Sequence, residues 1–136
     1  MGGSGAAALA VLLLADGRFP AGGHAHSAGV EAAVADGRVD GVASLAAYVR
    51  GRLWTAGLTD AAVAAAGALR LADWEGSGGV PAVLAELDAE ADARVVPPPL
   101  RAASRRLGTQ LVRAARRCWG GPVMDAAAGV HPAGPH

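Results

Sequence analysis

The 136-residue sequence carries twelve basic residues, all arginine, balanced by twelve acidic residues, so its formal net charge is zero. A neutral chain has no overall field that would draw it to nucleic acid or to a membrane surface. The single Cys118 excludes an internal disulfide and the cysteine-dense scaffold of small secreted proteins, so we expect a cytoplasmic protein.

Hydrophobic residues make up 52% of the sequence, and alanine, the best helix former, is the commonest of them. No alternating strand pattern occurs, so we predict an all-α protein, a compact array of about six helices. The length fits one domain. We expect a flexible amino terminus over residues 1–5, a helical domain over 6–119 and an irregular tail over 120–136.

A short apolar helix is predicted over residues 6–16, and at that length it can neither span a bilayer nor resemble a signal peptide, since no positive charge precedes it. The next residues, Phe19 to Gly23, predict a tight corner, because proline lacks an N–H and paired glycines favour sharp turns. A second helix is predicted to open at His26 and Ser27 and to end at Gly37. We expect the corner to lie against the third and sixth helices.

The middle of the chain predicts three more helices. Ser44 or Asp40 can cap a third helix that reaches Ala56, and a fourth should run from Thr59 or Asp60 to Trp74. Pro81 suits the first turn of a fifth helix, whose apolar face carries Val83, Leu84 and Leu87 and whose other face carries Glu86, Asp88, Glu90 and Asp92. The three tryptophans, Trp54, Trp74 and Trp119, are interpreted as packing residues.

The prolines at 97–99 predict an extended spacer before a long sixth helix over residues 100–119. Gly108 inside that helix indicates close approach of a neighbouring helix. The predicted inward stripe consists of Leu100, Ser104, Leu107, Leu111, Ala114 or Ala115, and Cys118. The remaining positions are largely arginine, namely Arg101, Arg105, Arg106, Arg113, Arg116 and Arg117.

The polar residues of the corner and the arginines of the sixth helix fit none of four kinds of site: a metal site, a nucleophilic serine, a phosphate loop or a nucleic-acid site. His24 and His26 do not share a helix face, and a zinc or nickel site needs three or four converging donors. Ser27 lacks the glycine-flanked elbow of a nucleophilic serine. Gly22 and Gly23 lack the lysine and spacing of a phosphate loop. The arginines of the sixth helix lack the interleaved aromatic residues of a nucleic-acid site. We therefore predict no catalytic residues, no metal ligands and no cofactor.

The stretch FPAGGHAHSAGVE resembles the signature of the urease accessory protein UreF family. That signature usually reads leucine-proline-x-glycine-glycine-aromatic-x-histidine-serine-x-glycine-leucine-glutamate. The matching residues are Pro20, Gly22, Gly23, His26, Ser27, Gly29 and Glu31, whereas Phe19, His24 and Val30 depart from it. A second patch, residues 100–108, is similar to a later helix of the same family through its alanine-serine step at Ala103 and Ser104 and its hydrophobic-glycine step at Leu107 and Gly108. The candidate partner-binding residues of this patch are Arg101, Ser104 and Arg105.

The resemblance implies a helper in urease maturation. Members of the family bridge a UreD-like (also called UreH) scaffold on apo-urease and the GTPase UreG, and regulate GTP-dependent nickel insertion, with nickel passing through the assembly. It implies that the chain itself is not an enzyme, and that the matching residues named above form a partner-binding surface. A homodimer is also implied by the family, with contacts from helices that follow the region represented here.

Two further readings stay open on the residues alone. One is a stand-alone helical metal-binding protein that uses its histidines, and the other is a helical nucleic-acid binder that uses the arginine helix. The family's chains continue for several helices beyond position 136. We therefore expect an amino-terminal portion or a shortened member, with apolar helix faces left uncovered.

Overall fold

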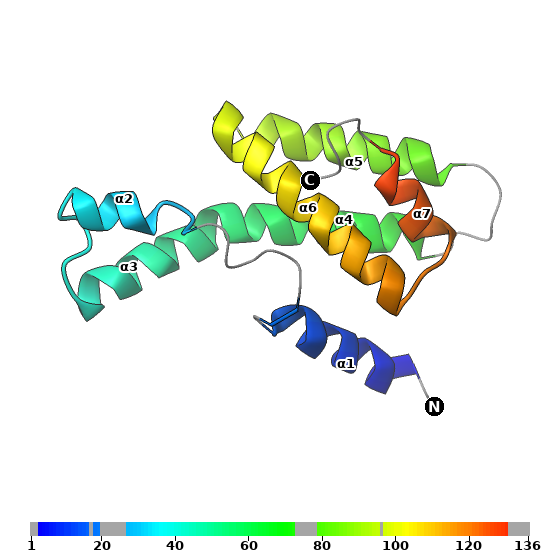
Figure 1. The fold of residues 1–136 in the computed structure, drawn as a ribbon, viewed down its shortest axis with the longest axis horizontal. Helices are drawn as coiled ribbons and strands as arrows, with labels where there is room; N and C mark the ends of the chain where they lie inside the picture. Colours follow the sequence, from blue (N-terminus) through cyan, green and yellow to red (C-terminus); the bar gives the residue numbers. More distant parts are fainter. Residues whose placement is uncertain (1–2, 17, 20–26, 73–78, 96, 131–136) are drawn as a thin grey trace.

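The structure, a computed structural model, describes residues 3–16, 18–19, 27–72, 79–95 and 97–130. Within these residues the chain is helical and has no strand, which confirms the predicted all-α class (Figure 1). The elements are α1 (Gly3–Ala15), α2 (Val30–Ala35), α3 (Val42–Arg52), the π-helical segment η1 (Leu53–Gly57), α4 (Leu58–Leu71), α5 (Val80–Arg94), α6 (Pro98–Cys118) and α7 (Pro122–Ala128).

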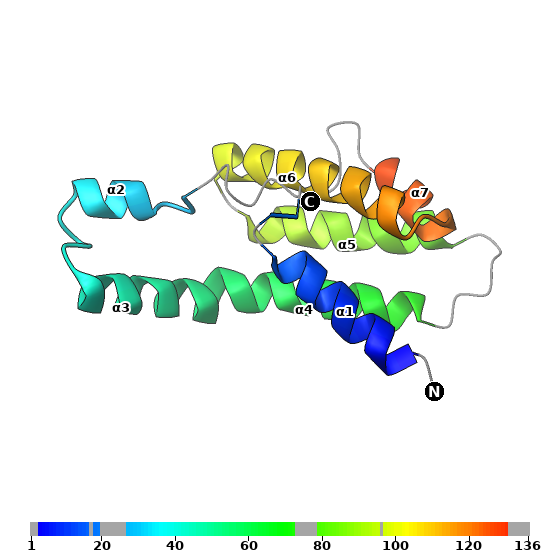
Figure 2. The same ribbon diagram turned by 60° about the horizontal axis from the view of Figure 1, so that its bottom comes forward.

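The helices α3 and α4 are joined by η1 into one continuous rod, which both ribbon views show (Figures 1 and 2). The prediction of two separate helices was wrong here. Gly57 keeps helical dihedrals (φ −60°, ψ −41°), so it does not end the helix. The wider π turn accommodates an extra residue without breaking the rod. Within it, the Thr55 hydroxyl donates a hydrogen bond to the Gly51 carbonyl at 2.8 Å.

The short helix α2 folds back along α3, and the two form a hairpin that extends beyond the rest of the molecule (Figure 2). α2 begins at Val30 and not at His26 or Ser27, because Ala28 (φ 51°) and Gly29 (φ 91°) hold left-handed backbone before it. Its predicted end is confirmed, since the chain turns away after Ala35.

The N-cap residue of α3 is Gly41, so neither Ser44 nor Asp40 occupies the predicted capping position. Ser44 lies in the first turn, and the backbone N–H groups of Asp40 and Gly41 each donate to its hydroxyl oxygen at 3.0 Å. Its hydroxyl group donates in turn to an Asp40 carboxylate oxygen at 2.7 Å. Ser44 thus reaches back to N–H groups before the helix, as the third helical residue of a capping box does.

The other end of the rod packs against α5, and α7 covers α5 and α6 (Figure 1). At the contact of α4 with α5, a Cβ added at Gly67 would lie 3.5 Å from the Leu87 side chain, an ordinary van der Waals distance. α5 starts with Pro81 in its first turn, as predicted, and Val80 beside it is fully buried. Among the described residues, the buried hydrophobic side chains are Ala33, Val39, Val80, Ala103, Ala114 and Ala115.

Helix α6 differs from its prediction at the start and in its buried face. Pro98 and Pro99 form its first turn, where the missing N–H groups leave no hydrogen bond unmade, so they are not an extended spacer. The buried residues of α6 are Ala103, Arg105, Gly108, Ala114 and Ala115, so the prediction is confirmed at Ala114 and Ala115, whereas the predicted inward residues Leu100, Leu111 and Cys118 are exposed. At 100° per residue the centre of the buried face is rotated by roughly 40° from the predicted one.

The tail predicted to be irregular contains α7, so that prediction was wrong for residues 122–128. Pro122, interpreted as a helix breaker, instead occupies the first turn. The Arg116 guanidinium on α6 forms an ion pair with the Asp125 carboxylate at 2.6 Å, which fixes α7 to the end of α6.

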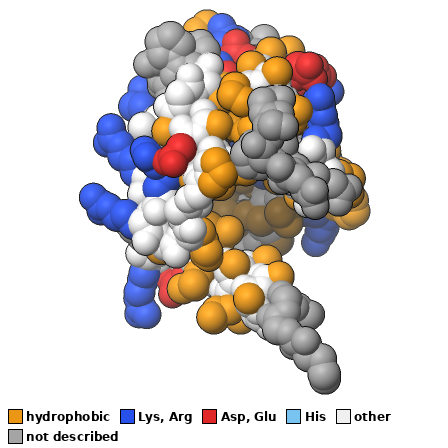
Figure 3. Space-filling model, turned by 90° about the vertical axis from the view of Figure 1, so that its right-hand side faces the viewer, with side chains coloured by type: hydrophobic (Ala, Val, Ile, Leu, Met, Phe, Trp, Pro, Cys, Tyr) orange, Lys and Arg blue, Asp and Glu red, His pale blue; other side chains and the backbone are white. Residues whose placement is uncertain are grey.

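The amino-terminal helix α1 stands apart from the rod and the other helices (Figures 1 and 2). It contains no charged residue, and its large side chains are exposed, namely Leu9, Val11, Leu12, Leu13 and Leu14. Figure 3 shows apolar side chains gathered at this lower edge of the molecule, beneath a hollow. No helix in the described part of the chain is both long and apolar enough to cross a membrane.

Candidate functional site

The turn that precedes α2 is held against α3 by the only tyrosine in the sequence. The Tyr48 hydroxyl donates to the Ala28 carbonyl at 2.9 Å. Gly29 follows with φ 91°, and a Cβ on it would lie 2.9 Å from the tyrosine oxygen. A glycine is therefore required at position 29 for two reasons, its left-handed backbone and its contact with Tyr48. This accounts physically for one of the signature glycines.

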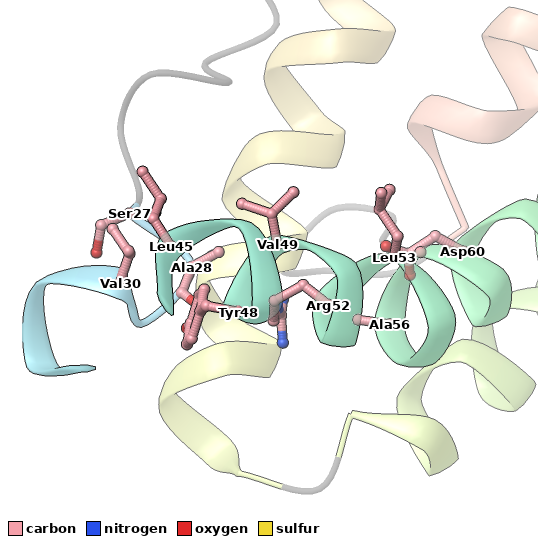
Figure 4. Close-up of a pocket in the computed structure, with 11 residues that line it drawn as sticks. Ser27, Ala28, Val30, Leu45, Tyr48, Val49, Arg52, Leu53, Ala56 and Asp60 are labelled. Carbon is pink, nitrogen blue, oxygen red and sulfur yellow. The ribbon is translucent and has the colours of Figure 1, made fainter. Parts of the chain in front are cut away.

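A groove of about 410 Å³ runs from this turn along α3 and η1, and we call it the signature groove (Figure 4). Its wall along the rod carries Leu45, Val49 and Leu53, spaced four residues apart. These side chains are exposed although they are apolar. The complete lining is Ser27, Ala28, Val30, Leu45, Tyr48, Val49, Arg52, Leu53, Ala56, Gly57 and Asp60.

A second cavity of about 370 Å³ continues the groove toward α6. The two cavities share four lining residues, Ala28, Arg52, Ala56 and Asp60. Arg52, Ala56 and Asp60 are spaced four residues apart. The π turn of η1 keeps them on one side of the rod, because a π-helix has more residues per turn than an α-helix. The second cavity ends at the start of α6, with Leu100, Ala103, Ser104 and Leu107.

Two opposite charges lie within the otherwise apolar signature groove, and Arg94 lines the second cavity. Arg52 and Asp60 are both exposed, and neither side chain forms a hydrogen bond or an ion pair with another residue that the structure describes. Eight residues of helix separate them, a distance of about 12 Å along the axis. An apolar floor with a single cation and a single anion is suited to orienting a bound polypeptide segment.

The predicted partner-binding residues fall into three groups. Pro20, Gly22, Gly23 and His26 lie outside the described residues, as do all four histidines on which the metal-binding alternative rests. Ser27 and Ser104 line the two joined cavities, and Gly29 stands beside Tyr48 at their edge. Glu31 is exposed in the first turn of α2 and does not line the groove.

Arg101 and Arg105 form the third group, and the structure places them in an ion-pair cluster between α5 and α6. The Arg105 guanidinium contacts the Asp88 carboxylate at 2.9 Å and the Asp92 carboxylate at 3.0 Å. Both the Arg105 and Asp88 side chains are only 9% exposed. Arg101 donates to the Val95 carbonyl at 3.0 Å. These side chains hold α5 and α6 together in this structure.

The corner was predicted to lie against the third and sixth helices. Most of its residues lie outside the described part of the chain, but residues on either side of it contact α3 and the end of α6. Ala28, on one flank, is bonded to Tyr48 of α3. Phe19, on the other, packs against Trp119 at the end of α6, with ring centroids 6.2 Å apart. Trp54, by contrast, is 68% exposed, so its interpretation as a packing residue was wrong.

Three groove residues were not identified from the sequence as site residues, namely Tyr48, Arg52 and Asp60. The sequence did contain a signal, because these three residues and Ala56 are spaced four residues apart. That spacing places residues on one face only if the helix contains a wider turn. Single-sequence periodicity assumes 3.6 residues per turn and therefore separates them.

Within the described part of the chain, no three His, Cys, Asp or Glu side chains gather as metal ligands would. The groove instead combines a long apolar wall with isolated charges and a rigid turn. The fold and the site thus define an all-α protein with an open binding surface along one helical rod.

The chain belongs to the UreF family. The family model described as UreF matches residues 39–135, a range that includes the second patch at 100–108 and begins after the first patch. The urease accessory protein UreF of Mycolicibacterium vanbaalenii is 49% identical over 116 residues, which cover 85% of this chain and 50% of that protein.

Two other relatives give the same result. The urease accessory protein UreF of Mycobacterium tuberculosis is 45% identical over 115 residues, 82% of this chain and 48% of the relative. That of Mycobacterium sp. strain JLS is 44% identical over 114 residues, with the same coverage. The chain therefore spans about half the length of the curated relatives it matches. No solved structure matches it.

Proposed function

We propose that this chain acts in urease maturation, as an accessory protein that binds a UreD/UreH-like scaffold and a UreG-like GTPase and regulates GTP-dependent nickel insertion into apo-urease. Family membership and the names of the relatives support the proposal. The observation that carries it is the signature groove, which joins the turn at Gly29 to the start of α6. Nickel is the cargo of that assembly, and GTP chemistry resides in the partner.

The groove would act by binding a partner segment. Leu45, Val49 and Leu53 offer apolar area that a partner can remove from water, at about 25 cal/mol per Å². Arg52 and Asp60 fix the direction of the segment, because a reversed segment would bring like charges together. The bond between Tyr48 and Ala28 keeps the groove wall in place before the partner arrives, so little ordering is needed on binding.

A matched pair of substitutions tests this role. Leu53→Asp places a charge on the groove wall, whereas Leu69→Asp makes the same change on α4 outside the groove; the two leucines are 62% and 78% exposed. Capture of the UreD/UreH-like and UreG-like partners, and GTP-dependent urease activation, should fall about tenfold for Leu53→Asp only. Glu31→Ala tests a separate contact outside the groove, which the resemblance implies, and should weaken capture as well. Equal losses for both leucine variants, or none for either, would contradict the proposal.

A further inference from the structure

The outward face of α6 carries a row of arginines that the proposed function does not use. Arg106, Gln110, Arg113 and Arg117 follow one another at intervals of four, three and four residues, the spacing of one helix face. All four are exposed, and the row lies opposite the buried Gly108 and Ala115. It extends about 16 Å along the helix. We call these four residues the arginine face.

Among the residues that the structure describes, no acidic side chain pairs with the arginine face. The acidic side chains of α5 pair elsewhere, Glu86 with Arg70, Glu90 with Arg94, and Asp88 and Asp92 with Arg105. On α6 itself, Arg116 pairs with Asp125. Arg106, Arg113 and Arg117 form no ion pair with any residue that the structure describes. Figure 3 shows arginine side chains projecting into solvent along one side of the molecule.

An apolar cleft of about 290 Å³ lies beside two of these arginines. It is lined by Phe19, Gln110, Arg113, Ala114, Arg117 and Cys118. The cleft therefore has an apolar floor with guanidinium groups beside it. Such a cleft can hold an aliphatic side chain that has carboxylates on either side of it. The face thus offers both a charge pattern and a position for one anchoring residue.

We propose that the arginine face binds an acidic amphipathic helix of a partner protein. The residues of the arginine face form a straight row at intervals of four, three and four. Carboxylates placed at the same intervals on another helix would form a matching row. Nucleic acid fits less well, because its binding surfaces place free aromatic rings among the basic residues, and here Phe19 is packed against Trp119. This inference does not depend on the role in urease maturation.

The test uses the full chain and a defined probe. The probe is a capped helical peptide with glutamates at the same four, three and four spacing and one leucine between them. A peptide of the same composition in scrambled order is its control. In fluorescence anisotropy at low salt we expect the patterned peptide to bind about tenfold more tightly. Its binding should weaken at higher salt, because exposed charges are screened.

Two double variants locate the binding. Arg113→Ala with Arg117→Ala should raise the Kd about tenfold, whereas Arg18→Ala with Arg50→Ala removes the same charge elsewhere and should leave it unchanged. Arg113→Glu with Arg117→Glu should instead bind a peptide with lysines at the four positions. Circular dichroism confirms that each variant is folded.

Three outcomes would overturn the proposal. The first is equal binding of the patterned and scrambled peptides. The second is an equal loss in both alanine double variants, which would indicate a general charge effect. The third is displacement of the peptide by a single-stranded oligonucleotide at lower concentration than by the unlabelled peptide, which would assign the face to nucleic acid.

Discussion

The contact between α5 and α6 and the hairpin of α2 and α3 use their side chains in opposite ways. Between α5 and α6, the charges of Arg105 and Asp88 are buried and paired. On the hairpin, apolar residues such as Leu45 and Val49 remain in contact with solvent. The first region satisfies its groups internally and stabilises the fold, and the second displays groups that a partner can satisfy. The buried ion pair and the exposed groove wall thus serve stability and binding, respectively.

The largest effect is expected where the buried charges meet. Arg105→Ala leaves Asp88 buried without its cation, and we expect the free energy of unfolding to fall by about 3 kcal/mol. Arg94→Ala, which removes an exposed ion pair with Glu90, should cost less than about 1 kcal/mol. Urea denaturation followed by circular dichroism measures both. Equal losses would mean that the two regions do not differ in the way described.

A smaller effect is expected at the turn that begins the groove. Gly29→Ala meets both a left-handed backbone and the Tyr48 oxygen, and should destabilise the protein by about 2 kcal/mol. Gly37→Ala has a similar backbone (φ 70°) but open space around it, so its cost should be about 1 kcal/mol. Adding Tyr48→Phe to Gly29→Ala should recover part of the difference in thermal unfolding. If Tyr48→Phe restores none of the lost stability, the contact with the Tyr48 oxygen does not contribute to the cost of Gly29→Ala.

The smallest effect on stability is expected on the open side of the rod. Trp54→Ala should change the free energy of unfolding by no more than about 0.5 kcal/mol, since the side chain is largely exposed. The same urea titration measures it. A loss of several times this amount would place Trp54 in a packed region and remove the contrast between the two regions.

Much of the fold could be predicted from the sequence, because most helices follow local rules. Pro81 begins α5 and the residues after Ala35 end α2, both through backbone preferences that a single sequence displays. Two of the errors have a similar cause. A gap was predicted after Ala56 and an irregular tail over residues 120–136, although Gly57 remains helical and Pro122 occupies a first turn.

The candidate site was harder to predict, because it depends on contacts between elements. Gly29 and Ser104 were selected by resemblance, and the structure places them at the joined cavities. Tyr48 was not selected, since nothing in its own helix reveals that its hydroxyl reaches Ala28, twenty positions earlier. The burial of Arg105 was missed for a similar reason. Its partners lie on α5, and periodicity within α6 favours an apolar inward stripe.

The unbroken run from Val42 to Leu71 has a mechanical consequence. A helix of this length, about 45 Å, bends little and behaves as a lever. A displacement of the end beside α2 would therefore tilt the opposite end, where α4 packs on α5. A force on the end beside α2 would thus change the packing of α4 on α5. Any bending of the rod would concentrate at η1, because its turn is wider than that of the α-helices on either side.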